Sequence, residues 1–408
     1  MRWTEGRNLE CFVDLLARGR IDMASLVTQV VPFADAVATY EKMNDGELKG
    51  IGFLFEYPEH VDIVRTVTRP PSPDAAAAAP AASATGQLRL GFIGCGNYAS
   101  TMLLPHLTER PDVQLVHVAT SSALSSVSAQ RKFGFHTAGS DHQAVLADPD
   151  IDAVFIVTRH SSHASMVCDA LRAGKAVFVE KPLAITSEQL DQVLDTVRET
   201  GNDRIQVGFN RRFAPMLVKM KASFGRRSQP AMLRYLVNAG RMDGTSWYNQ
   251  AASEGTRFCG EGGHFIDTMA WFVGSDPATV SAARAGSLVD DVHVTIGFAD
   301  GSCGVVTYTT QGSRRFQKET FEVVADGKVA RLDNFTAASV WGSARRRRQR
   351  ALGPDKGQKA EVEAFLTAVR RGGSMPIALR SLAAVTAATV AVDEALASGG
   401  SVKLPALA

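Results

Sequence analysis

The sequence predicts an α/β fold with a doubly wound parallel sheet, followed by an α+β domain with a largely antiparallel open sheet. A short α/β extension precedes them. Two observations predict this order. Near-continuous apolar runs alternate with amphipathic stretches from residue 88 to residue 212, and apolar segments joined by tight turns follow from about residue 230. A chain of 408 residues is too long for one hydrophobic core, which agrees with two domains and an additional piece.

Composition narrows the class of protein. The 44 Lys and Arg residues nearly balance the 42 Asp and Glu residues, and the net charge of +2 predicts no nucleic-acid partner and no membrane partner. The start, MRWTEGRNLE, carries charges without a following apolar stretch, so we expect no signal peptide. The five cysteines are widely spaced and never form a C-x-x-C pair, which favours reduced thiols and a cytoplasmic location.

The N-terminal segment, residues 1–67, is expected to be a small α/β piece. NLECFVDLLARGRI has apolar residues at helical spacing, and GIGFLFEYP indicates a short buried strand. Such a piece has a marginal core, so we expect it to pack on the rest of the chain or on a partner. The following stretch, residues 68–87, is rich in Pro, Ala and Ser and is predicted to be a linker.

Residues 88–212 are predicted to form the parallel sheet. The expected strands are LRLGFIG, VQLVHVAT, AVFIVT, AVFVEK and RIQVGFN, and the helices between them include SSHASMVCDALRAG and SEQLDQVLDTVRET. Strands that are apolar along their whole length and alternate with helices are buried on both faces, as in parallel sheets.

Residues 213–408 are predicted to form a domain for substrate binding and oligomerisation. MLRYLVNAG, DVHVTIGFADGSCGVVTYTT and ETFEVVADGKVARLD indicate strands, with tight turns at residues 299–301 and 325–327. The end of the chain, QKAEVEAFLTAVRRG and SLAAVTAATVAVDEALASG, is predicted to be helical with a glycine after each helix.

The stretch GFIGCGNYAST raises the question of a dinucleotide site, because it follows an apolar strand and precedes a predicted helix. In Gly94-x-Gly96-x-x-Ala99 the first glycine permits a sharp turn and the second lets the backbone approach a pyrophosphate. Ala99 allows close packing of helix and strand, as in a Rossmann domain. The alternative is a structural turn without ligand. The predicted contacts are Gly94, Gly96, Asn97, Tyr98 and Ala99.

The second strand lacks the carboxylate that would hold the adenosine ribose hydroxyls. It ends at Thr120, Ser121 and Ser122, whose hydroxyls could hold a 2′-phosphate together with Arg131. The cofactor is therefore expected to be NAD or NADP, with a slight preference for NADP. The alternative interpretation is that Thr120, Ser121 and Ser122 contact only the ribose or solvent.

Lys181 is the first candidate catalytic residue. It closes a run of buried strand residues in VFVEKP, so its ammonium is expected at the carboxyl edge of the sheet, where doubly wound folds bind ligands. There it would hydrogen-bond the reacting oxygen, and partial burial would lower its pKa. The other reading is a surface lysine that pairs with Glu180.

Together these motifs resemble the Gfo/Idh/MocA oxidoreductases over about residues 88–408. The resemblance rests on the glycine turn, the T-x-x-x-x-H segment 158–163, the E-K-P tripeptide 180–182 and VGFNRRFAP. It implies a Rossmann domain, an open-sheet domain, and NAD(P)-dependent chemistry on a hydroxyl or carbonyl of sugars and cyclitols. It also implies cofactor contacts from Thr158, His163, Glu180 and Lys181.

The family's D-x-x-x-H-x-x-D segment matches residues 260–267 only in part. His264 and Asp267 match, but Gly260 replaces the first acid, and the adjacent Glu261 is a possible substitute. The resemblance implies acid-base catalysis by His264; alternatively His264 is a helix-start residue that bonds backbone. No metal is expected, because one histidine beside Cys259 and Glu261 lacks a paired ligand motif. The predicted substrate contacts are Asn210, Arg212, Glu261 and Asp267.

Residues 1–60 are similar to the last segment of medium-chain, zinc-type alcohol dehydrogenases, without their zinc ligands or dinucleotide turn. This similarity leads us to expect the back half of a two-enzyme fusion whose first enzyme is truncated, and no chemistry in this segment.

The expected function is an NAD(P)-dependent oxidoreductase that acts on a hydroxyl or keto carbon of a sugar, cyclitol or nucleotide-sugar. A homo-oligomer, dimer or tetramer, is expected. The alternatives are a nucleotide-binding sensor or scaffold that has lost turnover, as Gly260 suggests, and a reductase of an imine or tetrapyrrole.

Overall fold

The computed structural model describes residues 4–59, 65–69, 86–242, 247, 250–342 and 346–405. It divides into two compact units, residues 1–64 and 65–408, and each is described by itself. Most of the predicted linker, residues 70–85, lies outside the described residues.

The first unit contains a two-stranded parallel sheet and two helices. Val31 and Thr39 are its only buried residues among those described. The strand expected at GIGFLFEYP is present, but its predicted burial is wrong, since Leu54 is 53% exposed. The elements are α1 (Glu5–Ala17), β1 (Val27–Pro32), α2 (Ala36–Asn44) and β2 (Gly52–Glu56), with 3₁₀ turns η1 (Ala24–Leu26) and η2 (Phe33–Asp35).

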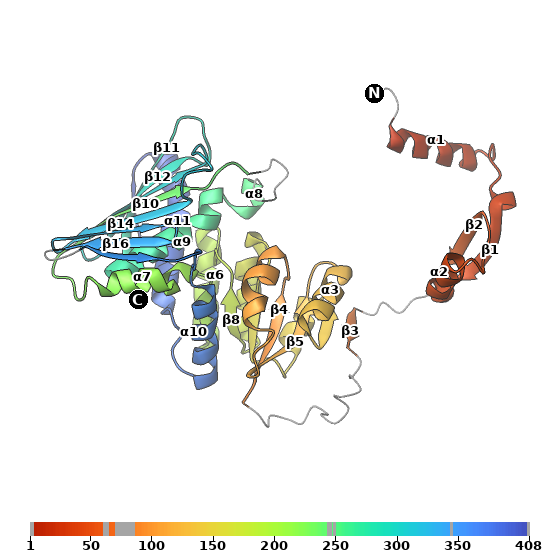
Figure 1. Ribbon diagram of the computed structural model, residues 1–408, viewed down its shortest axis with the longest axis horizontal. Coiled ribbons are helices and arrows are strands. Elements are labelled where there is room, and N and C mark those ends of the chain that lie inside the picture. Colours follow the sequence, from red (N-terminus) through yellow and green to blue (C-terminus); the bar gives the residue numbers. More distant parts are fainter. Residues whose placement is uncertain are drawn as a thin grey trace. The chain divides into compact units, whose positions relative to one another are not determined.

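The second unit begins with a seven-stranded Rossmann-type sheet (Figure 1). The five predicted strands are present and parallel, with two further strands at one edge. In spatial order the strands are β3 (Thr66–Thr68), β6 (Thr137–Gly139), β5 (Val113–Ala119), β4 (Leu88–Ile93), β7 (Ala153–Ile156), β8 (Ala176–Val179) and β9 (Ile205–Val207). Strand β3 is antiparallel to β6, so residues 66–68 belong to this sheet and not to the N-terminal segment or the linker.

Helices cover both faces of this sheet, as apolar strands require. They include α3 (Ala123–Phe133), α4 (His142–Ala147), α5 (His163–Arg172) and α6 (Ser187–Thr200).

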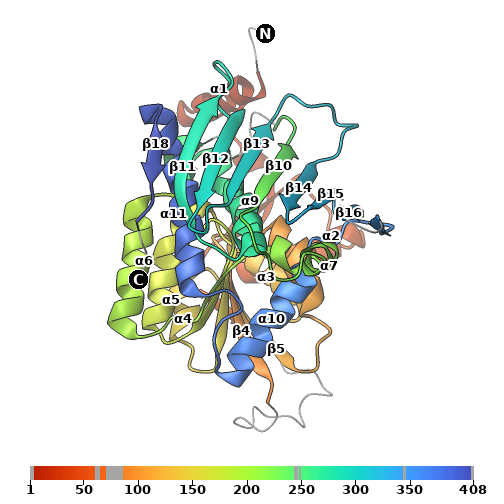
Figure 2. The same ribbon diagram turned by 90° about the vertical axis from the view of Figure 1, so that its left-hand side faces the viewer.

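On one face Phe92, Phe155 and Phe178 of neighbouring strands stack with centroids 4.7 and 4.8 Å apart. Phe365 of α10 (Gln358–Arg371) meets them edge-on, 5.5 Å from Phe155. Helix α10, which the sequence places in the second domain, therefore packs on the Rossmann sheet (Figure 2).

The second domain is built on a nine-stranded sheet that is antiparallel except for the pair β10–β13. Its hairpin turns follow from the sequence: Asp326 and Gly327 both adopt positive φ, +48° and +68°, between two strands. In spatial order the strands are β17 (Arg347–Arg350), β16 (Ala337–Trp341), β15 (Lys328–Asp333), β14 (Glu319–Ala325), β10 (Met232–Asn238), β13 (Cys303–Thr309), β12 (Val292–Phe298), β11 (Pro277–Arg284) and β18 (Ser401–Lys403).

Two long helices, α9 (Arg257–Val273) and α11 (Leu379–Ser398), pack on this sheet and on each other (Figure 2). Helix α11 is long and apolar enough to cross a membrane by length and composition alone, yet more than half of it is buried in this packing. The shorter helices are α7 (Pro215–Ala222) and α8 (Ala251–Glu254), and 3₁₀ turns η6 (His160–Ser162) and η7 (Asn210–Phe213) follow β7 and β9.

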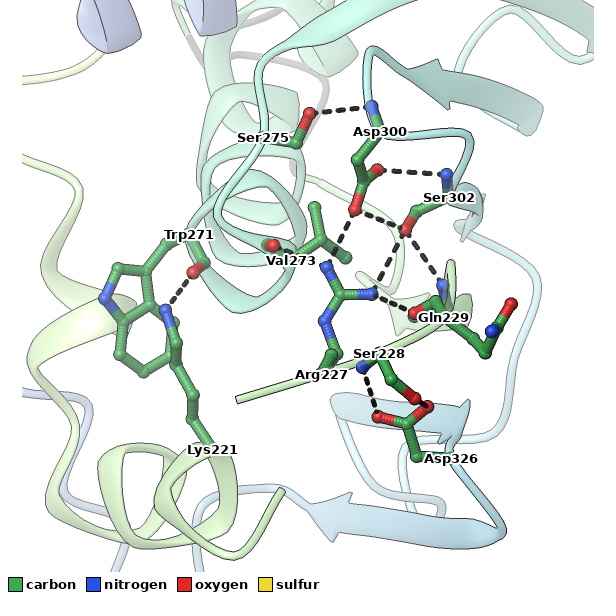
Figure 3. A network of polar contacts seen from close by, with 11 residues as sticks. Lys221, Arg227, Ser228, Gln229, Trp271, Val273, Ser275, Asp300, Ser302 and Asp326 are labelled. Atoms are coloured by element: carbon green, nitrogen blue, oxygen red, sulfur yellow. Dashed lines mark hydrogen bonds and ion pairs between the residues drawn. The ribbon is translucent and has the colours of Figure 1, made fainter. Parts of the chain in front are cut away.

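Cationic side chains fix the C-terminal end of α9 (Figure 3). Lys221 donates to the carbonyl oxygen of Trp271 and stacks over its ring, and Arg227 donates to the carbonyl of Val273 at 2.5 Å. Arg227 also pairs with Asp300 at 2.8 Å. Cations suit this end of a helix because its carbonyls carry partial negative charge. The contacts hold the helix that carries His264.

Candidate active site

The glycine turn at the end of β4 has the geometry that the sequence predicts. Gly94 has φ of +89°, and a Cβ there would lie 2.3 Å from the carbonyl oxygen of Val157. A Cβ on Gly96 would meet no atom within 4 Å, and the residue is exposed. Only glycine fits the first position, whereas the second leaves open backbone at the carboxyl edge of the sheet.

The segment after the turn differs from the expected regular helix. Asn97 is exposed and Tyr98 half-buried, while Ala99 is fully buried as close helix–strand packing requires. The backbone then forms a π turn, η4 (Ala99–Leu103), and a 3₁₀ turn, η5 (Leu104–His106). Pro105 lacks the N–H that a regular helix would need at this point, which explains the short, irregular element.

The end of β5 presents hydroxyls and no carboxylate. The Thr120 hydroxyl donates to the carbonyl of Ser122 at 2.7 Å, and Ser121 and Ser122 are exposed. Arg131, expected beside them, lies instead in the last turn of α3, at the opposite end of that helix. The structure therefore separates Arg131 from this hydroxyl cluster.

The E-K-P segment follows β8 at the same edge. Glu180 is 6% exposed, and its carboxylate accepts the N–H of Lys181 at 3.3 Å. Burial raises the pKa of Glu180 to about 7, although the charge of Lys181 opposes the shift. Gly208, after β9, leaves space for this side chain, because a Cβ there would lie 2.7 Å from Glu180 Oε1. The Lys181–Pro182 peptide bond is cis.

The histidines after β7 bond to neighbouring backbone. His163 is 1% exposed, with Nδ1 2.7 Å from the carbonyl oxygen of Pro182 and Nε2 3.3 Å from that of Thr158. Burial lowers the pKa of His163 to about 4, so the ring is neutral at pH 7. It joins the loops after β7 and β8. Thr158 shares a hydrogen bond with Ser162, 2.8 Å between the hydroxyls.

His264 lies in the first half of α9 and is 7% exposed. Its Nδ1 has no hydrogen-bond partner among the residues that the structure describes. Burial, together with the charges of Arg211 and Lys181, holds the pKa of His264 well below its ordinary value. The imidazole is therefore neutral and its Nδ1 can accept a hydrogen bond, but the lowered pKa makes it a weaker base than an ordinary histidine.

Lys181 and the first turns of α9 line one small cavity. Its other walls come from the segment after Lys181, from Phe209 and from α11. The Phe209 ring lies 6.3 Å from that of His264. The lining residues are Lys181, Pro182, Leu183, Phe209, Cys259, Gly260, Gly263, Thr386 and Thr389.

Three of the four predicted substrate contacts are used inside the protein. Asp267 is fully buried and accepts two hydrogen bonds from Arg212, at 2.5 and 3.0 Å. Asn210 is 2% exposed and donates to the carbonyl of Lys356 at 2.9 Å. These side chains join η7 to α9 and to the segment before α10. Glu261 remains partly exposed, with Arg257 4.0 Å away.

A second buried ion pair was not predicted. Arg211 makes two hydrogen bonds to Glu319 of β14, at 2.8 and 2.9 Å. Tyr235 and Lys356 also donate to this carboxylate, at 2.7 and 2.5 Å. Burial would raise the pKa of Glu319, but Arg211 and Lys356 outweigh it and lower the pKa. Arg211 and Glu319 lie 108 residues apart in sequence, so no local pattern indicates the pair.

Glu361 of α10 is the other residue that sequence reasoning missed. It is fully buried, and neither carboxylate oxygen has a well-formed hydrogen bond among the described residues. Burial raises its pKa well above the ordinary value, and the nearby charges of Glu180 and Asp267 add to the rise. Its environment therefore favours the protonated carboxyl over the carboxylate.

The strained glycine turn, the E-K-P segment and the parallel sheet define the class of the first domain: it is a Rossmann domain of the dinucleotide-binding type, followed by an open-sheet domain. Residues 88–209 match the Gfo/Idh/MocA family model, which is described as "Oxidoreductase family, NAD-binding Rossmann fold". The expected recognition is confirmed for this part of the chain.

Relatives are oxidoreductases of low identity. Uncharacterized oxidoreductase YrbE of Bacillus subtilis is 26% identical over 63% of this chain and 76% of its own length. The scyllo-inositol 2-dehydrogenase (NAD(+)) of the same organism is 36% identical, but only over 33% of this chain and 39% of its own length. Levoglucosan dehydrogenase in complex with NADH shares the fold, with a TM-score of 0.69 and 24% identity over 79% of this chain and all of that structure.

Proposed function

We propose that this protein transfers a hydride between a nicotinamide dinucleotide and a carbon that bears a hydroxyl or keto group on a sugar, cyclitol or nucleotide-sugar. The observation that carries the proposal is the position of Lys181, which follows β8 at the carboxyl edge of the Rossmann sheet and lies beside the first turns of α9, the helix that carries His264. Names of the relatives, inositol and levoglucosan dehydrogenases, support this substrate class.

The residues at the carboxyl edge fit the cofactor. Gly96 exposes its backbone beside the strained turn at Gly94, and the buried Nδ1 of His264 lacks a partner. Gly94, Gly96 and Ala99 would hold the pyrophosphate end, and Thr158, Glu180 and Lys181 would lie toward the nicotinamide. When bound, the nicotinamide accepts or supplies the hydride.

Lys181 and His264 would handle the substrate oxygen. In the oxidation, the C–H bond breaks with its electron pair leaving as hydride, the O–H proton passes to His264, and a C=O bond forms. The Lys181 ammonium hydrogen-bonds the oxygen and stabilises its developing negative charge. The neutral His264 ring has an acceptor nitrogen for this proton, and because its lowered pKa makes it a weak base, it would pass the proton on and not retain it.

The experiment is a comparison of Lys181→Ala with Lys219→Ala, an exposed lysine on α7. NADH fluorescence reports binding, and the nicotinamide absorbance reports turnover with a panel of polyols and keto sugars. Lys181→Ala should bind NADH nearly as wild type and turn over ~100-fold more slowly or worse. An unchanged rate removes Lys181 from the mechanism.

A nucleotide-binding sensor without turnover is the second candidate, because Gly260 stands where the resembled family has an acid. NADH binding by wild type without turnover across the panel would favour it.

We also propose a homo-oligomer formed through the second sheet and a cytoplasmic location. A row of aligned apolar side chains crosses four neighbouring strands, with Met232 60%, Val324 50%, Val329 41% and Trp341 37% exposed. Exposed apolar rows of this kind mark protein interfaces. Light scattering after gel filtration measures the state, and a monomer would contradict the proposal.

A further inference from the structure

Strand β3 adds an unexpected edge strand to the Rossmann sheet (Figure 1). Arg65 immediately precedes this strand. It pairs antiparallel with β6 in the register Thr66 to Gly139 and Thr68 to Thr137. Since β6 is parallel to β5, the start of β3 lies at the edge where β5 and β6 end. This is the carboxyl edge, where ligands of doubly wound sheets bind.

Two backbone hydrogen bonds connect the residue before β3 to the end of β5. The N–H of Ser140 donates to the carbonyl of Arg65 at 3.3 Å, and the N–H of Thr120 donates to the carbonyl of Gly139 at 3.1 Å. A Cβ on Gly139 would lie 3.0 Å from the Arg65 oxygen, so the two segments are in close contact. Arg65 therefore stands two strand spacings, roughly 10 Å, from Thr120.

The charges at this edge favour an anion. Arg65 is exposed and has no acidic partner among the described residues. The stretch 113–133, from β5 through α3, contains no Asp or Glu. The nearest carboxylate along β6 is Asp141, which accepts the N–H of Gln143 at 2.9 Å and caps α4. Ser121 and Ser122, which follow β5 at this edge, are exposed.

We propose that Arg65 binds the 2′-phosphate of NADP and gives the protein a preference for NADP(H) over NAD(H). The inference rests on the proposed function, because it concerns the cofactor of the same site. An arginine near the end of the second strand accommodates a 2′-phosphate where a carboxylate would repel it. The flexible side chain of Arg65 has the reach for a group that projects from Thr120 toward β6. The residue precedes the family match, which begins at residue 88.

Arg69 supplies the matched control, because it follows the other end of the same strand. Its N–H donates to the carbonyl of His136, just before β6 begins, so it lies at the opposite edge of the sheet. Both arginines are exposed, and either can be changed without loss of a packed side chain.

The experiment measures the affinities of NADPH and NADH, by nicotinamide fluorescence, for wild type, Arg65→Gln, Arg65→Lys and Arg69→Gln. Arg65→Gln should weaken NADPH binding about tenfold or more, with NADH within twofold, because one charge-assisted contact to phosphate is lost. Arg65→Lys should recover part of the affinity, and Arg69→Gln should change neither. Added salt should weaken NADPH binding by wild type more than by Arg65→Gln.

Equal effects on both nucleotides, or no effect on NADPH, would overturn the inference. Binding of NADH but not NADPH by wild type would overturn it and leave the proposed function standing. Binding of neither would overturn both.

Discussion

The glycine turn offers the sharpest test of the site, because its two glycines are expected to fail in different ways. In Gly94→Ala the new methyl must adopt a φ of +89° and would lie 2.3 Å from the backbone oxygen of Val157. In Gly96→Ala the methyl meets no atom within 4 Å. Gly94→Ala is therefore expected to lower the stability of the fold, whereas Gly96→Ala is expected to change only the affinity for the dinucleotide.

The expected loss of stability in Gly94→Ala follows from the positive φ and from the overlap with the Val157 carbonyl oxygen. A left-handed conformation costs an L-residue ~1–2 kcal/mol, and separating β4 from β7 adds a comparable amount, for about 2–4 kcal/mol in total. The second unit, residues 65–408, has an unfolding entropy of ~0.7 kcal/mol per kelvin at the usual value per residue. The expected fall in Tm is about 3–6 °C.

The assay combines thermal unfolding with NADH titration. Gly96→Ala should unfold within ~0.5 kcal/mol of wild type and bind NADH at least about tenfold more weakly, because its methyl occupies space that the pyrophosphate needs. Wild-type NADH affinity in Gly96→Ala would refute the turn as the phosphate site. A wild-type Tm in Gly94→Ala would refute the strain argument.

Three further predictions concern Glu361, Asp267 and the N-terminal segment. Glu361→Gln should be more stable than wild type near pH 8. The pKa of the buried Glu361 carboxyl is raised in the folded state, so this group stabilises the fold less as the pH rises above the ordinary carboxyl pKa of 4.5. Denaturant titrations at pH 4 and pH 8 measure the free energy of unfolding, and the difference between the two proteins should vanish at pH 4. Asp267→Ala should lower the free energy of unfolding by ~3–5 kcal/mol, because it leaves the Arg212 guanidinium buried and unpaired. Replacing both residues by apolar ones should recover much of that loss. A change in KM without a loss of stability would instead support a substrate role for Asp267. Deleting residues 1–64 should preserve turnover, since β3 remains paired with β6. Deleting residues 1–75 removes β3 and should lower the Tm of the remaining protein. Loss of turnover in the shorter deletion would show that the N-terminal unit contributes to catalysis.

The sequence predicts most of the fold because its apolar runs are strong. Buried strands such as β4 and β8 have near-continuous runs of apolar residues in the sequence. The turn after β4 needs a positive φ, and glycine, the residue that adopts it readily, stands there at Gly94. The three-residue strand β3 has no such pattern, since an edge strand needs few apolar side chains. Helix α10 is visible as a helix, but only tertiary packing of Phe365 shows which sheet it covers.

The sequence predicts the site less completely than the fold, because it does not show which charged side chains pair with each other. Lys181 and His264 follow from their positions after a strand and within a helix. The partners of Arg211 and Arg212 come from β14 and α9, so sequence alone left one arginine free to meet a ligand. Both guanidinium groups are instead neutralised by buried carboxylates, because an unpaired charge in these positions would be costly.

A crystal structure of the protein with bound NADH would test the central claim most directly. The account predicts the nicotinamide ring beside the Lys181 ammonium, with His264 close enough to share a bound polyol oxygen. A nicotinamide ring at any other edge of the sheet, or one with Lys181 and His264 on separate sides of the protein, would contradict it.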